Sequence, residues 1–481
     1  MSEATDAQSL AAKVASVLGQ RLAGFVSLEA VDRLSGGASQ ETYRISVTTS
    51  DGPRLLAMRR APGGVVAEEH VVGHPGLAAE ALLMRSAAAA GVPEPDVVHV
   101  LTPDDGIGDG FIMSWLEGEA LGARIARAPD FTDLRGHLAY DCGRILARIH
   151  AIDLQATGLS RALDAITPEE FLHQTWDRYK EWQTPQPMID YTGRWLLENL
   201  PKNPRTALVH NDFRNGNFMV DQNAIVAVLD WELAHIGDPM RDLGWICTNS
   251  WRFGVTDLPV GGFGLREDLY RGYADESGIA VDPDHVKFWE VFGSFWWAVG
   301  CLGMAEHYRT GPDQTVERPA IGRRTSECQV DCVNLLIPGE TTVVEALGDD
   351  DGVDMPTLDE LLGSVRDFLH QDVMQETSGR LNFLARVAGN SLDIVRREAQ
   401  SGARLREQEL SLLQALLDSD QGTVAQLRWQ LVYGLRNATL DVDAQALQAY
   451  LRFAVVNQVA IDQPKYSGYR TARRNAGLSA S

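Results

Sequence analysis

The sequence is poor in cysteine and in positive charge. Its 481 residues include 5 cysteines, which form no CxxC pair and no pattern with histidine that would bind a metal. This usage fits a reducing compartment, so we expect a cytoplasmic protein. Lysine and arginine number 43 against 66 aspartates and glutamates, for a formal net charge of −23. Such a surface repels phosphates, so nucleic acid and acidic membranes are not expected as partners.

Long apolar runs are lacking as well. A membrane span needs about 20 consecutive apolar residues, and the sequence has no such stretch. The N-terminus carries acidic residues early and has no apolar core, which is unlike a secretory signal. What remains is an ordinary globular composition, 44% hydrophobic and 23% charged, over a length that favours two or three folding units.

The first part of the chain has the pattern of an antiparallel sheet with one helix. A short amphipathic helix is expected at 10–23, followed by two alternating strands joined by a glycine-rich turn at 35–39 and then by a third strand. Residues 76–90 predict a helix, which Gly91 ends. Two further strands are expected, near 97–101 and 110–115.

From about residue 119 the pattern becomes mostly helical. A short hairpin interrupts it between Phe218 and Leu229, and helices are expected again from about 239 to 337. A stretch rich in proline, glycine and acidic residues then predicts a linker, and apolar residues at helical spacing follow it. These observations predict four segments, namely an N-terminal lobe at 1–117, a helical lobe at 118–340, a linker at 341–356 and an all-α domain at 357–481.

The strongest chemical signal is a polar loop before the hairpin, His210-Asn211-Asp212-Phe213-Arg214-Asn215-Gly216-Asn217, with Asp230 just after it. Phosphoryl transfer needs a carboxylate that orients the acceptor hydroxyl and takes its proton, and oxygen ligands that hold Mg²⁺ against the phosphates. Asp212 and Asn217 can serve these two needs from one loop, and the hairpin returns Asp230 beside them. The alternative is an ordinary Asx-rich turn, which the order, the spacing and the flanking strands disfavour.

This pattern, H-x-D-x-x-x-x-N followed by an aspartate, resembles the catalytic and metal-binding loops of the protein-kinase superfold. The longer string LVHNDFRNGNFMV…VAVLDWELAHIGDPMRDLGW is similar to the aminoglycoside phosphotransferase and choline kinase family. More narrowly, it resembles the phosphotransferase domains linked to acyl-CoA dehydrogenases, over about residues 30–335. The resemblance implies an α+β, protein-kinase-like bilobal fold, with an antiparallel sheet in the N-lobe and a helical C-lobe. An all-α C-terminal domain would follow.

The resemblance also implies roles for residues of the loop. Asp212 is expected to be the catalytic base, with Asn217 and Asp230 as the Mg²⁺ ligands. His210 is expected to brace the loop, and Arg214 is grouped with the catalytic residues. Asn211 stands where the family usually has glycine, and asparagine tolerates left-handed backbone angles better than most residues. Asp242 in the matching DLGW segment is expected to support the loop.

For ATP, the kinase pattern needs a cation on the third strand, paired with a glutamate on the next helix. We assign Arg59 and Glu80, with arginine in place of the family's lysine. The other expected nucleotide contacts are Ser35, Gly36, Gly37 and Ser39 in the glycine-rich turn, and Met113 and Trp115 at the hinge. A plain hairpin turn, a solvated Arg59 and an ordinary strand end stay open as alternatives.

Aromatic residues crowd the segment 288–297, namely Phe288, Trp289, Phe292, Phe295, Trp296 and Trp297. Core packing is the favoured interpretation, and the wall of an acceptor pocket is the alternative.

The sequence therefore predicts an ATP- and Mg²⁺-dependent phosphotransferase that acts on an alcohol group of a small molecule. The acceptor could be a hydroxyacyl thioester, an amino-alcohol or a sugar. The alternative is a nucleotide-binding pseudokinase or scaffold, which the intact Asp212, Asn217 and Asp230 disfavour. The C-terminal domain resembles a small domain of unknown function found beside such phosphotransferases. Homodimer formation, partner docking and covering of the acceptor site are open roles for it.

Overall fold

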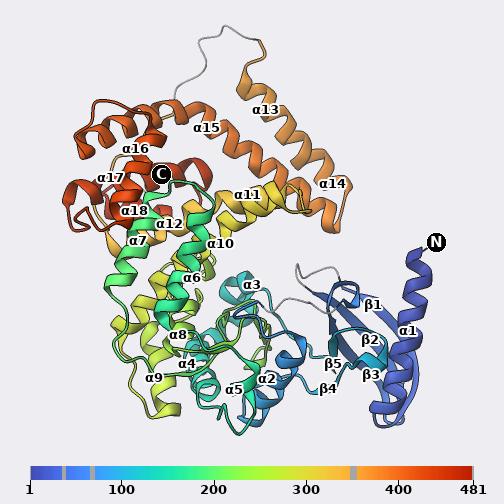
Figure 1. Cartoon of the computed structure of the whole chain (residues 1–481). Coiled ribbons are helices and arrows are strands. Elements are labelled where there is room, and N and C mark those ends of the chain that lie inside the picture. The colour runs from blue at the N-terminus through green and yellow to red at the C-terminus, as the bar shows by residue number, and fades with distance from the viewer. Residues whose placement is uncertain (1, 35–39, 66–70, 347–354, 479–481) are drawn as a thin grey trace. The chain divides into compact units, whose positions relative to one another are not determined.

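The computed structural model of the chain describes residues 2–34, 40–65, 71–346 and 355–478 (Figure 1). The expected nucleotide turn, with Ser35, Gly36, Gly37 and Ser39, lies outside these ranges. The chain divides into two compact units. Unit 1 consists of Met1–Thr167, Asn203–Cys247 and Trp251–Val286, and unit 2 of Pro168–Lys202, Thr248–Ser250 and Lys287–Ser481. The four segments expected from the sequence follow chain order instead, and they stay a prediction.

Unit 1 contains a five-stranded antiparallel sheet in the order β1-β2-β3-β5-β4. Its strands are β1 (Phe25–Arg33), β2 (Glu41–Thr49), β3 (Gly52–Arg60), β4 (Val97–Val100) and β5 (Gly110–Ser114). The helix α2 (Leu77–Ala89) lies between β3 and β4 in chain order. Gly91 follows it with φ of 79°, a left-handed conformation that favours glycine. The predicted order of strands and helix is confirmed.

The helix α1 (Ser2–Arg21) covers one face of this sheet (Figure 1). Val14 and Leu18 pack with Ile45 and Val47 of β2, whose side chains alternate with outward-facing ones. The helix begins earlier than the predicted residue 10, because the apolar periodicity used for the prediction reports only the part that packs on the sheet.

The rest of unit 1 combines helices with short strands. These are α3 (Gly122–Arg127), α4 (Thr132–His150), α5 (Leu159–Ala162), β6 (Ala207–Val209), β7 (Phe218–Val220), β8 (Ile225–Val228), β9 (His235–Gly237), α8 (Met240–Cys247) and α9 (Arg266–Ser277). The hairpin of β7 and β8 is where the sequence predicted it. The antiparallel pair of β6 and β9 was not predicted, because three-residue strands carry too little alternation to recognise.

Helices resume in the range 239–337, as predicted, in the form of α8, α9 and the helices that follow them, with an irregular segment between α8 and α9. Between α8 and α9 the chain forms turns, with Gly254, Gly261 and Gly262 at positive φ. Such glycines favour turns over helix, because they lose more backbone freedom in a helix than other residues do.

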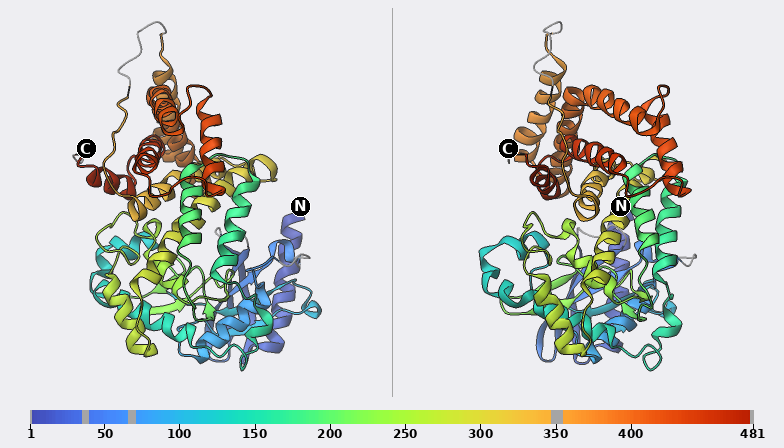
Figure 2. Two further views of the ribbon diagram at one scale, coloured as in Figure 1. Left: turned by 60° about the vertical axis from the view of Figure 1, so that its left-hand side comes forward. Right: turned by 90° about the vertical axis from the view of Figure 1, so that its left-hand side faces the viewer.

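Unit 2 is helical throughout its regular elements (Figures 1 and 2). They are α6 (Pro168–Glu181), α7 (Pro187–Glu198), most of α10 (Pro283–Thr310), α11 (Glu317–Arg323), α12 (Thr325–Leu336), α13 (Leu358–Asp367), a π-helical segment (Phe368–Val373), α14 (Met374–Glu376), α15 (Gly379–Leu417), α16 (Val424–Arg436), α17 (Gln445–Asp462) and α18 (Ser467–Asn475). Met188 of α7 and Val330 of α12 share one hydrophobic core with Leu431 of α16 and Leu451 of α17. Helices from both sides of the expected linker therefore form one packed body.

The aromatic residues of α10 divide between two environments. Phe288, Trp289, Phe292 and Phe295 are buried in the core, as the favoured interpretation predicted. Trp296 and Trp297 are only partly buried, and with Trp182 they line a cavity of about 320 Å³ in unit 2.

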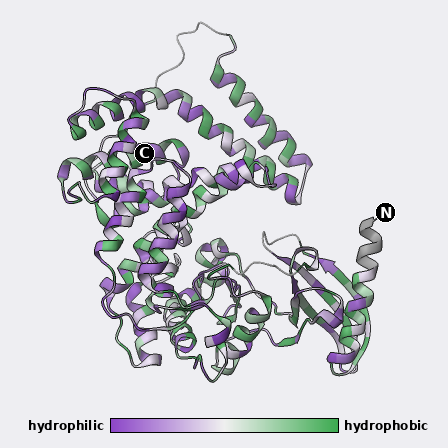
Figure 3. Ribbon diagram, in the orientation of Figure 1, coloured by the Kyte–Doolittle hydropathy of each residue, from purple (hydrophilic) through white to green (hydrophobic). Residues whose placement is uncertain are grey.

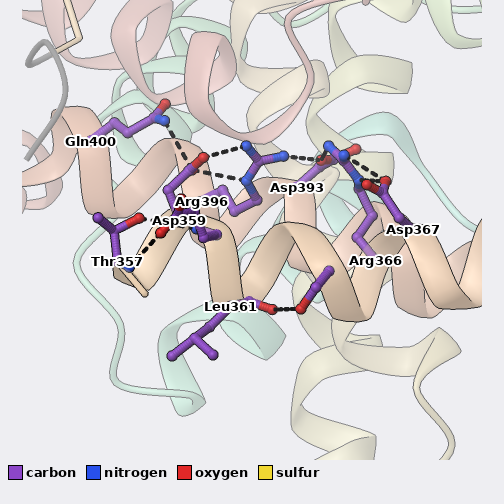
Figure 4. Close-up of polar contacts among 10 residues, drawn as sticks. Thr357, Asp359, Leu361, Arg366, Asp367, Asp393, Arg396 and Gln400 are labelled. Carbon is purple, nitrogen blue, oxygen red and sulfur yellow. Dashed lines mark hydrogen bonds and ion pairs between the residues drawn. The ribbon is translucent and has the colours of Figure 1, made fainter. Parts of the chain in front are cut away.

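The helix α13 packs on α15 through its charged side. Arg396 binds Asp359 through two nitrogens, at 2.6 and 2.9 Å, and Arg366 donates to Asp393 at 3.1 Å (Figure 4). Apolar and polar residues both occur along α13 (Figure 3). Leu358, Leu361 and Val365 of the apolar stripe, and Phe368 just after the helix, are each more than half exposed, while Leu362 is partly buried. The helix itself is confirmed, but its apolar face is not a core face among the described residues of unit 2.

None of the helices in the described residues is long and apolar enough to cross a membrane.

Candidate active site

The polar loop follows β6 and is held in place by a buried carboxylate. Asp242, in the first turn of α8, accepts hydrogen bonds from the backbone N–H groups of His210 at 2.9 Å and Asn211 at 2.7 Å. It also meets His150 of α4, whose Nε2 lies 3.0 Å from Asp242 Oδ2. Burial alone would raise the pKa of Asp242, but these partners hold it below its ordinary value. Asp242 therefore supports the loop as an ionised acceptor.

His210 joins the loop to the far end of the hairpin. Its Nε2 lies 3.0 Å from the carbonyl oxygen of Leu229, and its Nδ1 lies 3.3 Å from the backbone nitrogen of Asp212. A carbonyl only accepts and a backbone N–H only donates, so this imidazole is neutral, with its proton on Nε2. Complete burial lowers the pKa of His210 and favours the same neutral form. These contacts suit a brace better than a proton carrier.

Asn211 takes the backbone conformation that its position requires. Its φ is 69°, in the left-handed region where glycine is usual. Asparagine tolerates this conformation, and its Oδ1 accepts a hydrogen bond from Arg241 Nε at 2.9 Å. Arg241 in turn lies over the ring of Trp245 at 4.6 Å.

The carboxylate of Asp212 is oriented by three side chains. Its Oδ1 accepts from Trp245 Nε1 at 2.6 Å and from Arg214 Nε at 3.0 Å. Its Oδ2 accepts from the side-chain amide of Asn217. Arg214 is itself held over the ring of Trp251, 4.1 Å from its centroid. With 14% of its side chain exposed, Asp212 is fixed in direction but still reachable from solvent.

Asn217 lies where the loop enters the hairpin. Its Nδ2 also donates to the backbone oxygen of Asp212 at 3.0 Å, and its backbone carbonyl accepts from the N–H of Leu229 at 2.8 Å. The Leu229 bond places the two ends of the hairpin side by side, and so sets Asp230 next to the loop. Among the described contacts, Asn217 Oδ1 accepts no hydrogen bond, so this oxygen can bind a cation.

Asp230 and Arg59 connect the loop to the sheet. Arg59 of β3 donates to Asp230 Oδ1 at 3.0 Å and to Gln40 Oε1 at 2.8 Å, and its Nη1 lies 3.4 Å from Glu80 Oε2 on α2. Gln40 also donates to Glu80 Oε1 at 3.0 Å. Burial raises the pKa of Glu80, and the charge of Arg59 opposes that rise. The expected pairing of Arg59 with Glu80 is present, and a second pairing with Asp230 accompanies it.

Arg60 points to the other face of β3, as neighbours in a strand do. It lies 3.6 Å from Glu41, a residue that also pairs with Arg33 at 3.3 Å.

The two expected hinge residues lie at the end of β5. Met113 is buried opposite Ala57 of β3, and Trp115 donates from its backbone to Leu55 at 3.3 Å. The indole of Trp115 donates to Glu117 at 2.8 Å. No described contact joins Met113 or Trp115 to the loop around Asp212.

Sequence reasoning missed several residues that complete this site. Trp245 belongs to the quoted DLGW string, and Gln40 directly follows the glycine-rich turn, so both had a signal in the motifs. His150 and Trp251 had none, because they reach the site from distant parts of the chain.

The donors at this site fit a hard divalent cation. An amide oxygen of Asn217 and the carboxylate of Asp230 are the oxygen ligands that Mg²⁺ prefers, with nucleotide phosphates and water as its other ligands. Within the described ranges, no group of three or more His, Cys, Asp or Glu side chains could hold a metal by itself. A magnesium ion here would therefore depend on a bound phosphate.

The fold and this loop together define a kinase-like protein. The structure matches that of a Ralstonia eutropha protein, provisionally assigned as an aminoglycoside phosphotransferase, with a TM-score of 0.54 and 22% identity. The match covers 67% of this chain and 97% of the other. The model of the phosphotransferase enzyme family matches residues 30–277. The chain belongs to this phosphotransferase enzyme family.

Curated relatives share the same region. Acyl-CoA dehydrogenase family member 10 of Mus musculus is 30% identical over 308 residues, which are 60% of this chain and 27% of that protein. Acyl-CoA dehydrogenase family member 11 of Gallus gallus is 29% identical over 311 residues, which are 61% of this chain and 38% of that protein. The chain thus spans about a quarter to two-fifths of the length of these relatives. Residues 375–466 match a domain of unknown function, DUF6285.

Proposed function

We propose that the protein is an ATP- and Mg²⁺-dependent phosphotransferase that phosphorylates an alcohol group of a small molecule. The observation that carries the proposal is the chain of hydrogen bonds from Asp212 through Asn217 to Leu229, the neighbour of Asp230. Family membership over residues 30–277 supports the same reaction.

In this mechanism Asp212 receives the acceptor hydroxyl. Trp245 and Arg214 donate to Oδ1, which turns the carboxylate and fixes its direction. An acceptor hydroxyl would donate to this carboxylate, which orients it and takes its proton as the oxygen attacks the phosphoryl group. Because little covalent chemistry is needed, this positioning supplies much of the rate.

Asn217, Asp230 and Arg59 would bind the phosphates. When bound, Mg²⁺ neutralises phosphate charge. Asn217 Oδ1 and the Asp230 carboxylate would hold the ion, and Arg59 would steer the phosphate tail. Glu80 and Gln40 keep the Arg59 side chain extended toward Asp230. Arg59 is a planar fork that can bind two phosphate oxygens at once, whereas the lysine usual in the family is a point charge.

For the acceptor we propose a hydroxyacyl thioester, because curated relatives that match this region carry the name acyl-CoA dehydrogenase. Amino-alcohols and sugars are the competing acceptors. A panel of the three classes with Mg-ATP, read as ADP formation and as mass of the phosphorylated product, distinguishes them. Phosphorylation of only an amino-alcohol or a sugar would overturn the acceptor assignment and keep the phosphotransferase.

The first prediction concerns Asp212→Asn, assayed with whichever acceptor the panel identifies. We expect phosphorylation to fall by about 10²–10⁴-fold, since the amide cannot take the proton. Asp221→Asn is the matched control, because Asp221 lies in the exposed hairpin turn of the same segment. If the wild type binds ATP but has no turnover beyond that of Asp212→Asn, the scaffold alternative is favoured.

The second prediction concerns Asp230→Ala. We expect the Mg²⁺-dependent part of ATP affinity to be lost, because the variant removes a carboxylate ligand. Calorimetric titrations of the protein with ATP, in the presence and absence of Mg²⁺, measure this part of the affinity. An unchanged dependence on Mg²⁺ would mean that Asp230 is not a metal ligand.

A further inference from the structure

A cavity of about 510 Å³ lies within unit 2, and the proposed reaction does not use it. Part of its wall comes from α7, α10, α11, α12 and the loop before α7, and the rest comes from α15, α16 and α17. The second group lies largely in the part of the chain that matches DUF6285. The volume of the cavity is in the range of sites that bind small organic molecules.

One part of the wall is rich in arginine. Arg406 of α15 and Arg428 of α16 both bind the buried carboxylate of Glu409, at 2.9 Å and 2.6 Å. Tyr450 also donates to Glu409, at 3.0 Å. Two guanidinium groups thus share one carboxylate, which leaves one positive charge in excess at this end of the cavity.

Three further charged side chains line the cavity, namely Arg309, Arg323 and Asp462. Arg323 Nη1 lies 3.1 Å from Asp462 Oδ1. Burial raises the pKa of Asp462 to about 6, and the charge of Arg323 opposes that rise. Arg323 also binds Glu398, and Arg309 lies 3.5 Å from Glu306, so these three side chains add no positive charge in excess. The local excess of positive charge lies at Arg406 and Arg428.

These two arginines keep donors for a ligand. A guanidinium has five N–H groups. In the described contacts Arg406 donates through Nη1 to Glu409 and through Nη2 to Gln458, and Arg428 donates through Nε and Nη2, both to Glu409. The Nε of Arg406 donates in none of these contacts, whereas Arg428 also hydrogen-bonds to Tyr450. A planar guanidinium fork is well suited to carboxylate and phosphate oxygens.

Apolar side chains form another part of the wall. Met188, Leu302, Leu451, Ala454 and Val455 line it. Met188, Leu451 and Val455 are nearly fully buried in the core of unit 2, while Leu302 and Ala454 are only partly buried. An apolar body attached to an anionic group would bury against Leu302 and Ala454, which a purely inorganic ion would leave uncovered.

We propose that this cavity binds an amphipathic organic anion, with a carboxylate or phosphate group against Arg406 and Arg428 and an apolar body against Leu302 and Ala454. The protein has a formal net charge of −23, so general attraction of anions does not explain such binding. The anionic group would need these particular donors.

The test uses the full chain and three eight-carbon probes, octanoate, octyl phosphate and the neutral octanol. Calorimetry at constant ionic strength measures their affinities. We expect at least one anion to bind about tenfold or more tightly than octanol, since a charge-assisted hydrogen bond contributes on that scale. The stronger anion identifies the headgroup as carboxylate or phosphate. If neither anion exceeds octanol, the proposal is overturned.

Two variants locate the site. Arg406→Gln should weaken the anion about tenfold, while Arg428 still neutralises Glu409 and keeps the fold. Ala454→Trp should block the cavity and abolish binding of all three probes. Arg404→Gln is the matched control on the same helix, because Arg404 donates instead to the backbone oxygen of Glu345 and does not line the cavity. If Arg404→Gln and Arg406→Gln weaken the binding of the anion equally, or if Ala454→Trp binds the probes as tightly as wild type, this location of the site is overturned.

Discussion

At the level of single residues, one buried carboxylate organises the candidate site. Asp242 accepts from two successive backbone N–H groups, those of His210 and Asn211, and meets His150 on its other side. A carboxylate with several donors can stay ionised while fully buried, which an isolated buried acid cannot. The direction of Asp212 therefore depends on a residue that need not touch the substrate.

Buried histidines predict how stability changes with pH. Burial lowers the pKa of His235 in β9 to about 4, from an ordinary value of 6.5. Below pH 6.5, His235 is protonated in the unfolded chain but stays neutral in the folded chain. Protons therefore favour the unfolded state, and stability falls as pH drops from about 6.5 toward 4. From this residue we expect a loss of about 2 kcal/mol between about pH 7 and pH 5. The lowered pKa of His210 acts in the same direction.

Urea unfolding across this pH range measures the effect. A His235→Gln variant should have a flatter profile, because glutamine does not titrate. The control is His137→Gln, since His137 is exposed on α4 and pairs with Asp141 one turn away. Identical slopes for wild type and His235→Gln would contradict the assignment.

At the level of elements, α4 and α9 are joined by ion pairs to Glu276, which we call the Glu276 clasp, as well as by close packing. Arg148 and Arg144 of α4 donate to Glu276 of α9, each at 2.8 Å. The hydrogen bonds from Arg148 and Arg144 lower the pKa of Glu276 to about 2. Close backbone approach accompanies them, since a Cβ on Gly143 would meet the Leu269 oxygen at 2.1 Å. Glycine at this position therefore lets the two helices pack closely.

The Glu276 clasp predicts an acid-dependent contribution to stability. We expect Glu276→Gln to lower the free energy of unfolding by about 1 kcal/mol near neutral pH, a modest value because the pair is partly solvated. Because the pKa of Glu276 is lower in the folded chain than in the unfolded chain, its ionised carboxylate stabilises the fold at pH values above about 4.5. The difference in unfolding free energy between Glu276→Gln and wild type should therefore shrink as pH falls from about 4.5 toward 2. Denaturant titrations at several pH values measure it. Glu267→Gln, an exposed site in the first turn of α9, should have no effect.

At the level of the whole molecule, the C-terminal helices complete a core that begins earlier in the chain. Tyr191 of α7 and Val333 of α12 pack with Leu435 of α16 and Val456 of α17. Arg436 of α16 also donates to the buried carboxylate of Asp190 at 2.7 Å. The matched family region and the DUF6285 region are therefore connected through unit 2.

This shared core predicts the result of truncation. A chain that ends at residue 340 should expose the apolar faces of α7 and α12, and we expect it to aggregate or to melt at a lower temperature. Size-exclusion chromatography and thermal unfolding measure this, with a chain that ends at residue 478 as the control. A monomeric fragment with an unchanged melting temperature would contradict the shared core.

Exposed apolar residues on α13 and just after it are relevant to the role of the C-terminal domain, which the sequence left open. Leu358, Leu361, Val365 and Phe368 are exposed, while the inner side of the helix is occupied by ion pairs. Homodimer formation and partner docking stay predictions from the sequence.

Much of the fold and of the loop could be predicted from local pattern. The strands of the N-terminal sheet, the helix ended by Gly91 and the hairpin after Asn217 each depend on residues within a few positions of one another, so alternation, spacing and turn chemistry reveal them. The catalytic roles of Asp212, Asn217 and Asp230 stay a prediction. Contacts between distant residues leave no such pattern, which is why Trp251 and His150 were missed.

The order of residues along the chain was enough to show which polar groups stand together at the loop, because their spacing is short. It could not show which distant side chains support them, as His150 and Trp251 do, or which helices share a core across residues 341–356. Nor could it show that much of the apolar face of α13 stays exposed. Those features follow from three-dimensional packing, since periodicity records that a face is apolar, whereas the partner of that face depends on how the whole chain folds.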